Sequence, residues 1–336
     1  MRIPIRAFRA QTLATIGVAF ALALGSMASR AQAPQPAQSG AKPISVIVPF
    51  SAGSASDVIG RLLLDRVALN SGRSFVYLNR PAAGGNVGTL SVVRAEPDGL
   101  TIGFSTSGPL AVNKILNSDL GYDPEKDLQA IGVVAVLPNI VVVSVELPID
   151  SLAKLIDYLR KTPDVGYGSV GNGSSQHLAG AFFEQLIGAR MTHVPYRVTG
   201  NLVTDLASGR VPVSFQLLPN VLASIQGAKI RPLAVAAKTR LAALPNVPTA
   251  AEAGLPEYES AAWFALIAPR GLSRSFVDRL NADVNVALRD PAVRARFTEL
   301  GAEPRESSPE DMSRVMAADI AKWSEIIRKG GITLGQ

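Results

Sequence analysis

The sequence predicts an α/β protein whose two lobes enclose a ligand in a cleft. Apolar strands alternate with helical segments along a chain of 336 residues, a length that allows about two domains. Two strand-to-helix loops of small residues, within Ile44–Asp57 and Tyr167–Gln176, fall in different halves of the chain. Such loops expose backbone N–H groups at a helix N-terminus, where anions bind without a charged side chain. An anionic ligand held between two lobes is therefore expected.

Short runs of β-branched and other apolar residues between turn residues predict the strands. In order, these runs are Ile44–Phe50, Phe75–Leu78, Leu100–Ser105, Ile131–Val136, Ile140–Val145, Val165–Ser169, a short run around His193, Val211–Phe215, Arg231–Ala236 and Ala261–Ala268. Because helices separate most of them, the sheets are expected to be largely parallel.

Apolar residues at helical spacing, with capping residues before them, predict the helices. The first begins at a cap on Ser56 or Asp57 and ends at Gly72. The others are predicted near Asn86, from about Gly108, at Leu152–Lys161 behind a Ser151 cap, from Ser174 or Ser175 to Ile187, up to Gly209, and at Ser275–Arg289, Pro291–Leu300 and Pro309–Lys329. Thr249–Glu252 matches a capping box.

The N-terminus has the pattern of a cleaved secretory signal at residues 1–33. Arg2, Arg6 and Arg9 form a basic segment before the apolar stretch Thr12–Gly25, and small residues at cleavage spacing end at Ala28 or Ala33. An uncleaved anchor helix is the alternative, although the apolar stretch is short for a membrane span. A disordered lead-in at 34–42, rich in Pro, Gln and Ser, is expected to follow.

Composition excludes several classes of function. The chain has no cysteine, which excludes disulfides, thiol catalysis, thiolate zinc sites and an N-terminal lipid on cysteine. It has two histidines and no acidic cluster with ligand spacing, so no metal is expected. Four of the 33 Lys and Arg residues lie in the signal segment, which leaves 29 bases against 27 acids. The alkaline precursor is therefore not evidence of nucleic-acid binding.

Two apparent catalytic motifs are better explained by structure. Gly166–Gly171 matches G-x-G-x-x-G, but its first glycines fall within a predicted strand and no acid closes the next strand, so a dinucleotide cofactor is not expected. Ser151 and Lys154 match S-x-x-K, yet Ser151 stands where a helix cap belongs. No G-x-S-x-G elbow occurs.

Three side chains near the second glycine loop have open roles. His177, in the first turn of the following helix, could pack, contact a ligand or act as a base, whereas His193 in a short strand is expected to be structural. Arg197 could offer its guanidinium to a carboxylate or could be an ordinary solvated arginine. No nucleophile, base and acid can be combined around them, so no enzyme activity is expected.

An ordered set of short motifs covers the whole mature chain and resembles one family, the substrate-binding receptors of tripartite tricarboxylate transporters, also called Bug proteins. The motifs are Pro43–Asp57, Asn79–Asn86, Pro97–Thr101, Gly171–Ser174 with His177 and Leu178, Val194–Tyr196, Pro245–Gly254, Trp263, Ala268–Pro269, Leu280–Asn281 and Trp323. The resemblance implies a type II periplasmic binding protein fold with one carboxylate or dicarboxylate ligand held mainly by backbone amides and small hydroxyls.

The ligand is accordingly expected at the two glycine loops and their neighbours. The expected binding residues are Ser51, Ala52, Gly53, Ser54, Ala55, Ser56, Asp57, Ser107, Ser169, Gly171, Asn172, Gly173, Ser174, Ser175, His177, Tyr196 and Arg197. The first lobe is expected to be discontinuous, at 43–138 and 245–336, and the second to span 139–244.

The function that these observations predict is a periplasmic solute receptor, a monomer without a cofactor or membrane anchor. It would capture a small carboxylate, with one or two carboxyl groups, and deliver it to the membrane permease of a tripartite transporter. The alternative is a ligand-binding module that serves a sensor kinase or another signalling pathway.

Overall fold

The computed structural model describes residues 42–330, which belong to one unit of the chain, Ser39–Gln336. The predicted signal peptide at 1–33 and nearly all of the predicted lead-in at 34–42 lie outside this range. Within it, no helix is both long enough and apolar enough to cross a bilayer.

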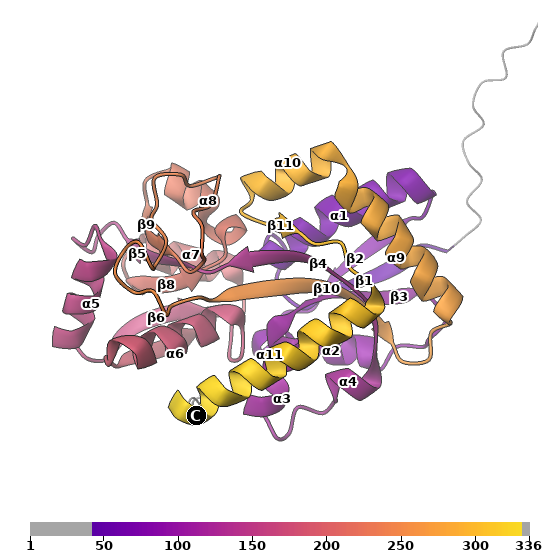
Figure 1. Ribbon diagram of the computed structural model, residues 1–336, viewed down its shortest axis with the longest axis horizontal. Coiled ribbons are helices and arrows are strands. Elements are labelled where there is room, and N and C mark those ends of the chain that lie inside the picture. Colours follow the sequence, from indigo (N-terminus) through magenta and orange to yellow (C-terminus); the bar gives the residue numbers. More distant parts are fainter. Residues whose placement is uncertain (1–41, 331–336) are drawn as a thin grey trace, which may run out of the picture. The chain divides into compact units, whose positions relative to one another are not determined.

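Two sheets organise the described residues (Figure 1). The first has six strands in the order β2-β1-β3-β10-β4-β11, and the second has five in the order β7-β6-β8-β5-β9. The strands are β1 (Ile44–Val48), β2 (Phe75–Asn79), β3 (Thr101–Thr106), β4 (Leu128–Pro138), β5 (Ile140–Ser144), β6 (Val165–Ser169), β7 (Met191–Pro195), β8 (Val213–Gln216), β9 (Ile230–Val235), β10 (Ala261–Pro269) and β11 (Glu303–Pro304). Each sheet and the helices on it are called the first and the second lobe.

The expectation of largely parallel sheets is wrong, because each sheet is mixed. β1 is parallel to β2 and β3, but β10 is antiparallel to β3 and β4. Likewise β6 is parallel to β7 and β8, but β5 is antiparallel to β8 and β9. In each sheet, the strand that arrives from the other lobe inserts between the third strand and the departing strand. The two lobes therefore share one topology, although the sequence shows no repeat.

The helices agree with the predicted ones at most positions. They are α1 (Ala55–Ser71), α2 (Asn86–Val93), α3 (Asn113–Leu116), α4 (Pro124–Asp127), α5 (Leu152–Lys161), α6 (Ser175–Ile187), α7 (Thr199–Ala207), α8 (Leu218–Gln226), α9 (Arg274–Arg289), α10 (Pro291–Glu299) and α11 (Pro309–Gly330), with a 3-10 turn at Ala83–Gly85 and a π-helix at Gly108–Val112. α4 and α8 were not predicted. The capping-box bonds of Thr249 and Glu252 form, but the chain there makes a turn instead of a helix.

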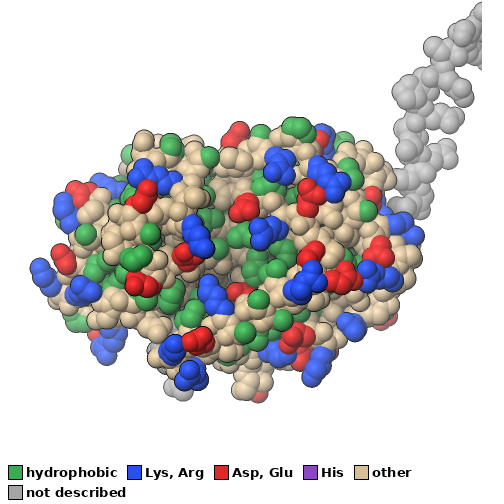
Figure 2. Space-filling view, in the orientation of Figure 1, with side chains coloured by type: hydrophobic (Ala, Val, Ile, Leu, Met, Phe, Trp, Pro, Cys, Tyr) green, Lys and Arg blue, Asp and Glu red, His purple; other side chains and the backbone are tan. Residues whose placement is uncertain are grey.

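Apolar clusters cover both faces of each sheet. In the first lobe, one face packs on α1, α9 and α10 and the other on the π-helix and α11. In the second lobe, α5 and α6 cover one face and α7 and α8 the other. α11 also reaches the second lobe, because the Trp323 ring meets Phe182 of α6 edge-on at 6.4 Å. Figure 2 shows basic and acidic side chains interspersed on the visible face, without a patch of one sign there.

The chain passes between the lobes at one hydrogen-bonded junction. Asn139 separates β4 from β5, and its N–H donates to Ser260 O at 2.8 Å while its carbonyl accepts from Ala236 N at 2.8 Å. Ser260 N in turn donates to Ala236 O at 3.0 Å. After the junction Thr249 pairs with Val235, so this part of the return segment lies on the second sheet. The lobe boundaries expected at 139 and 245 stay predictions.

Candidate functional site

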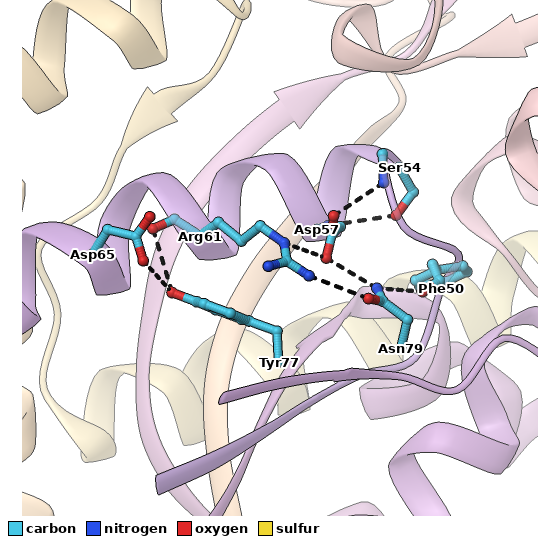
Figure 3. A network of polar contacts seen from close by, with 8 residues as sticks. Phe50, Ser54, Asp57, Arg61, Asp65, Tyr77 and Asn79 are labelled. Atoms are coloured by element: carbon cyan, nitrogen blue, oxygen red, sulfur yellow. Dashed lines mark hydrogen bonds and ion pairs between the residues drawn. The ribbon is translucent and has the colours of Figure 1, made fainter. Parts of the chain in front are cut away.

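Hydrogen bonds to the Asp57 carboxylate fix the conformation of the first glycine loop (Figure 3). Asp57 Oδ2 accepts from Gly53 N at 3.0 Å, and Oδ1 accepts from Arg61 Nε at 2.9 Å and Asn79 Nδ2 at 3.0 Å. Asn79 Nδ2 also donates to Phe50 O at 3.0 Å. The Asp57 carboxylate, which was expected to lie at the ligand, is thus occupied in fixing the loop.

The helix that follows this loop starts earlier than predicted. Ser54 is the N-cap of α1, and its hydroxyl oxygen accepts from Asp57 N at 3.4 Å. The cap predicted on Ser56 or Asp57 is therefore wrong. Because α1 begins at Ala55, the N–H groups of Ala55 and Ser56 both belong to its first turn, whose donors have no partner within the helix.

The second glycine loop is supported by a pair of histidine rings. His177 Nδ1 accepts from Gly173 N at 3.1 Å, and His193 Nε2 is hydrogen-bonded to Ser169 Oγ at 2.6 Å. The two rings stack with their centroids 4.0 Å apart. Burial lowers the pKa of His177 to about 4, and burial together with His177 lowers the pKa of His193 to about 3. His177 is therefore neutral at neutral pH, as an acceptor Nδ1 requires, and it supports the loop.

The second loop touches the first lobe backbone to backbone. A Cβ atom at Gly84 would overlap Asn172 O, and one at Gly108 would overlap Gly173 O. Gly173 itself has φ +76°, and a Cβ there would overlap Asn113 Oδ1. Asn113 Oδ1 is buried without a hydrogen-bond partner among the described residues. These positions require glycine because the lobes approach each other there.

Four further hydrogen bonds join the lobes. Ser51 Oγ donates to Thr199 Oγ1 at 3.0 Å and accepts from Thr199 N at 3.1 Å. Ala55 N donates to Asn220 Oδ1 at 2.7 Å. Arg197 Nε donates to Pro81 O at 2.9 Å. The hydroxyl of Ser51, another expected binding residue, therefore bonds to the opposite lobe.

Two neighbouring hollows lie between the lobes, and Phe50 and Val170 border both. The inner cavity, of about 10 Å³, has room for about one water. Its lining is Phe50, Ser54, Ala55, Ser56, Thr106, Val170, Ser175, Gln176, Leu217 and Asn220. The outer pocket, of about 390 Å³, is lined by Phe50, Pro81, Ala82, Ala83, Asn86, Asn117, Val170, Gly171, Asn172, Pro195, Tyr196 and Arg197.

The inner cavity is a meeting point of two helix N-termini. The first turns of α1 and α6 both reach it, and Ser54 and Ser174 cap them. The caps take the N–H groups of Asp57 and His177, and Asn220 takes that of Ala55. The N–H groups of Ser56, Ser175 and Gln176 have no acceptor within residues 42–330. Two positive helix ends with free donors favour an anion.

The structure divides the expected binding residues into three sets. Ser54, Ala55, Ser56 and Ser175 line the inner cavity, and Gly171, Asn172, Tyr196 and Arg197 line the outer pocket. The rest line neither: Ser51, Ala52, Gly53, Asp57, Ser107, Ser169, Gly173, Ser174 and His177. Several of these fix the loops or join the lobes, as the hydrogen bonds above show.

Sequence reasoning missed the cavity residues that lie outside the glycine loops. Asn220 is the main one, since its amide reaches Ala55 of the opposite lobe. The available signal was Pro219 after a strand, which is typical of a first helical turn and would have placed Asn220 at a helix start. Asn113 and Thr199, which line neither hollow but lie where the lobes meet, carried no comparable signal. In the described part of the chain, no group of His, Asp and Glu could hold a metal ion.

Comparisons with known proteins identify the family and the fold. The family described as tripartite tricarboxylate transporter family receptor, TctC, matches residues 59–332. Protein BugT of Bordetella pertussis is 34% identical over 296 residues, 88% of this chain and 91% of BugT. Solved periplasmic binding proteins share the fold, which confirms the predicted two-lobed α/β class.

Two of the similar solved structures contain a dicarboxylate. Rpa4515 of R. palustris with adipate is 37% identical, has a TM-score of 0.84, and the match covers 87% of this chain and 98% of that chain. MatC of Rhodopseudomonas palustris with bound malate is 29% identical, has a TM-score of 0.80, and the match covers 85% and 98%. By the extent of these matches, the chain belongs to the tripartite tricarboxylate transporter receptor family and is a solute-binding receptor, not an enzyme.

Proposed function

We propose that this receptor captures a small organic carboxylate between its lobes and delivers it to the membrane permease of a tripartite transporter. The observation that carries the proposal is the meeting of the α1 and α6 N-termini at the inner cavity, with three N–H groups free to donate. A carboxylate matches these donors, because its two oxygens accept several hydrogen bonds and its charge suits both helix dipoles.

The chemistry of the surroundings supports an anion over a cation or a sugar. The inner cavity is lined by hydroxyls, amides and apolar groups, and the Asp57 carboxylate of the adjoining helix turn is occupied within its loop. Adipate in Rpa4515 and malate in MatC, both dicarboxylates, point to the same class of ligand.

A carboxylate is larger than the inner cavity, so binding involves a displacement. The Asn220 amide oxygen accepts from Ala55 N at 2.7 Å, and a carboxylate oxygen would take that place. We expect the lobes to part by rotation at the junction of Asn139, Ala236 and Ser260, to admit the ligand and to close on it. Closing the lobes would rebuild the bonds of Ser51 to Thr199 and of Arg197 to Pro81.

A proline substitution can remove one backbone donor from the site. Ser56 is the second residue of α1, and proline is tolerated in a first turn because its missing N–H has no partner within the helix. Ser56→Pro should weaken carboxylate binding about tenfold or more, the worth of a hydrogen bond to a charged group. Ser56→Val keeps the N–H with comparable bulk, and Ser275→Pro makes the same change at the second residue of α9, away from the site.

Isothermal titration calorimetry on the mature protein and these variants tests the proposal. A first screen by thermal shift uses carboxylates, sugars and polyamines, since a ligand at a hundredfold over its Kd adds about 2.7 kcal/mol of stability. Carboxylate hits that Ser56→Pro weakens and Ser275→Pro leaves intact would support the proposal. Hits confined to sugars or cations would refute it.

The same proposal places the mature protein in the periplasm as a monomer, freed by cleavage between Ser26 and Pro36. N-terminal sequencing and sedimentation of periplasmic material test these points, and an intact Met1 in a membrane fraction would contradict them. Delivery to a permease is tested by deleting a neighbouring pair of genes for polytopic membrane proteins. Loss of uptake supports transport, and an intact uptake with a lost transcriptional response would favour the sensor role.

A further inference from the structure

The outer pocket contains one charged side chain, Arg197, and no Asp or Glu among its lining residues. Its other polar side chains are the amides of Asn86, Asn117 and Asn172 and the phenol of Tyr196. The Tyr196 hydroxyl donates to Asp205 Oδ2 at 2.7 Å, and Arg210 also pairs with Asp205 at 2.6 Å. The Asp205 carboxylate behind Tyr196 is therefore already paired, and the lining of the pocket keeps a net positive charge.

Arg197 is oriented by the opposite lobe without losing its capacity for a carboxylate. Its Nε–H donates to Pro81 O at 2.9 Å, which uses one of the five guanidinium donors. No carboxylate within residues 42–330 forms an ion pair with it. The two Nη atoms can therefore donate two hydrogen bonds to one carboxylate, which is the geometry that arginine favours.

A helix end adds to the positive potential on the other wall. α2 begins at Asn86, which lines the outer pocket, and its N-cap Gly85 supplies no capping side chain. The positive end of the α2 dipole therefore reaches the pocket from the first lobe, whereas Arg197 comes from the second. Together they form a second place for negative charge, separate from the inner cavity.

Phe50 and Val170 lie between these two places. Both residues border the inner cavity and the outer pocket, and they pack together with Leu202 in one apolar cluster. A ligand that reaches both hollows must cross this apolar pair, where methylene groups are favoured and charge is not.

We infer that the receptor selects α,ω-dicarboxylates and that Arg197 is the residue that selects them. One carboxylate binds at the α1 and α6 N-termini, an aliphatic spacer passes Phe50 and Val170, and the second carboxylate binds the Nη edge of Arg197 in the outer pocket. The inference rests on the proposed function and adds to it the ligand's second charged group and the residue that reads it.

The test compares diacids with monoacids of equal length. Calorimetry on the mature protein uses the series from succinate to suberate and the series from butyrate to octanoate. In the wild type the best diacid should bind at least about tenfold more tightly than its monoacid partner, the worth of a charge-assisted hydrogen bond. Arg197→Gln should remove that preference, because it should weaken the diacid about tenfold or more beyond any loss that the monoacid shares through the missing bond to Pro81. Arg197→Lys should keep only part of it, because an ammonium cannot form the two-bond pair.

Arg80→Gln is the matched control, since Arg80 is an exposed arginine next to Pro81 that bonds to Ser91 and does not line the pocket. It should leave the diacid preference unchanged. If Arg80→Gln and Arg197→Gln lost the diacid preference equally, the preference would come from the overall charge of the protein, and the inference would be overturned. Equal binding of monoacids and diacids by the wild type would overturn it while the proposed function stands. If no acid of either series binds, both fail.

Discussion

Gly173→Ala tests whether ligand binding depends on the close approach of the two lobes. Gly173 has φ +76°, and a methyl group there would overlap the side chain of Asn113, which belongs to the first lobe and is fully buried. Two costs follow. Alanine in the left-handed region costs about 1–2 kcal/mol, and the overlap costs about 1–3 kcal/mol, as overpacking does.

These two costs fall on different states of the protein. The backbone strain is present whether the lobes are open or closed, so it lowers the free energy of unfolding by about 1–2 kcal/mol. The overlap is relieved when the lobes part, so it acts against closure alone. If the bound state is closed, carboxylate affinity should fall roughly 5-fold to 150-fold, which corresponds to about 1–3 kcal/mol.

Two further variants separate the terms. Gly72→Ala places the same residue at φ +71° with no atom within 4 Å, far from the site, so it reports the strain alone. Gly173→Ala combined with Asn113→Ala removes the atoms that the new methyl group would strike and should restore most of the affinity. Urea unfolding and calorimetry measure the two quantities.

Two results would refute this reasoning. The first is a Gly173→Ala protein that binds its carboxylate as tightly as the wild type, since closure would then not need the contact. The second is a double variant that binds no better than Gly173→Ala, since Asn113 would then not be the obstacle.

Three other changes have definite expected outcomes. Because the pKa of His177 is lowered from 6.5 to about 4, the folded state takes up fewer protons than the unfolded one, and this group should lower stability by about 3 kcal/mol as pH falls from about 6.5 to 4. His193, whose pKa is also lowered, adds to the same decline, so His177→Asn should make the decline in urea titrations smaller, and an unchanged slope would contradict the assignment. Asp57→Asn should lower the unfolding free energy by about 1–3 kcal/mol and weaken ligand binding, because Gly53 N, Arg61 and Asn79 lose a charged acceptor. Wild-type values in calorimetry and urea unfolding would argue against a role of Asp57 in fixing the loop. Ser151→Ala should lower the free energy of unfolding by about 1 kcal/mol, because Ser151 Oγ accepts from Lys154 N at 3.3 Å. Ligand affinity should not change, and any loss of binding would show that the α5 cap is coupled to the site.

Local signals were sufficient for most secondary structure. The bounds of α5 and β6 were predicted to the residue because Ser151 and the turns beside them leave no competing choice. The start of α1 was predicted two or three residues late, since Ser54, Ser56 and Asp57 can all cap a helix and only the extended backbone of Ser54 decides among them. Strand direction in the sheets could not be read locally, because it depends on which strand arrives from the other lobe.

The site was predicted as two loops, but not as a pair of facing surfaces. The helix N-termini follow from the residues of each loop. Their partners lie far away in sequence: Ser51 bonds to a residue 148 positions on, and Ala55 to one 165 positions on. Gly173 was also expected to lie at the ligand, whereas the structure places the Asn113 side chain of the first lobe beside it. Only the packing of the lobes provides these contacts.

The junction of Asn139, Ala236 and Ser260 determines the mechanics of the receptor. Because the outgoing and returning segments are bonded to each other there, neither can slide along the other without breaking a backbone hydrogen bond. We therefore expect the lobes to move relative to each other mainly by rotation about this junction. A rotation of a few degrees at the junction would move the atoms beside it very little. It would move the edge of the cleft, where Arg197 contacts Pro81, much further. A pair of fluorophores would report opening best when placed at that edge.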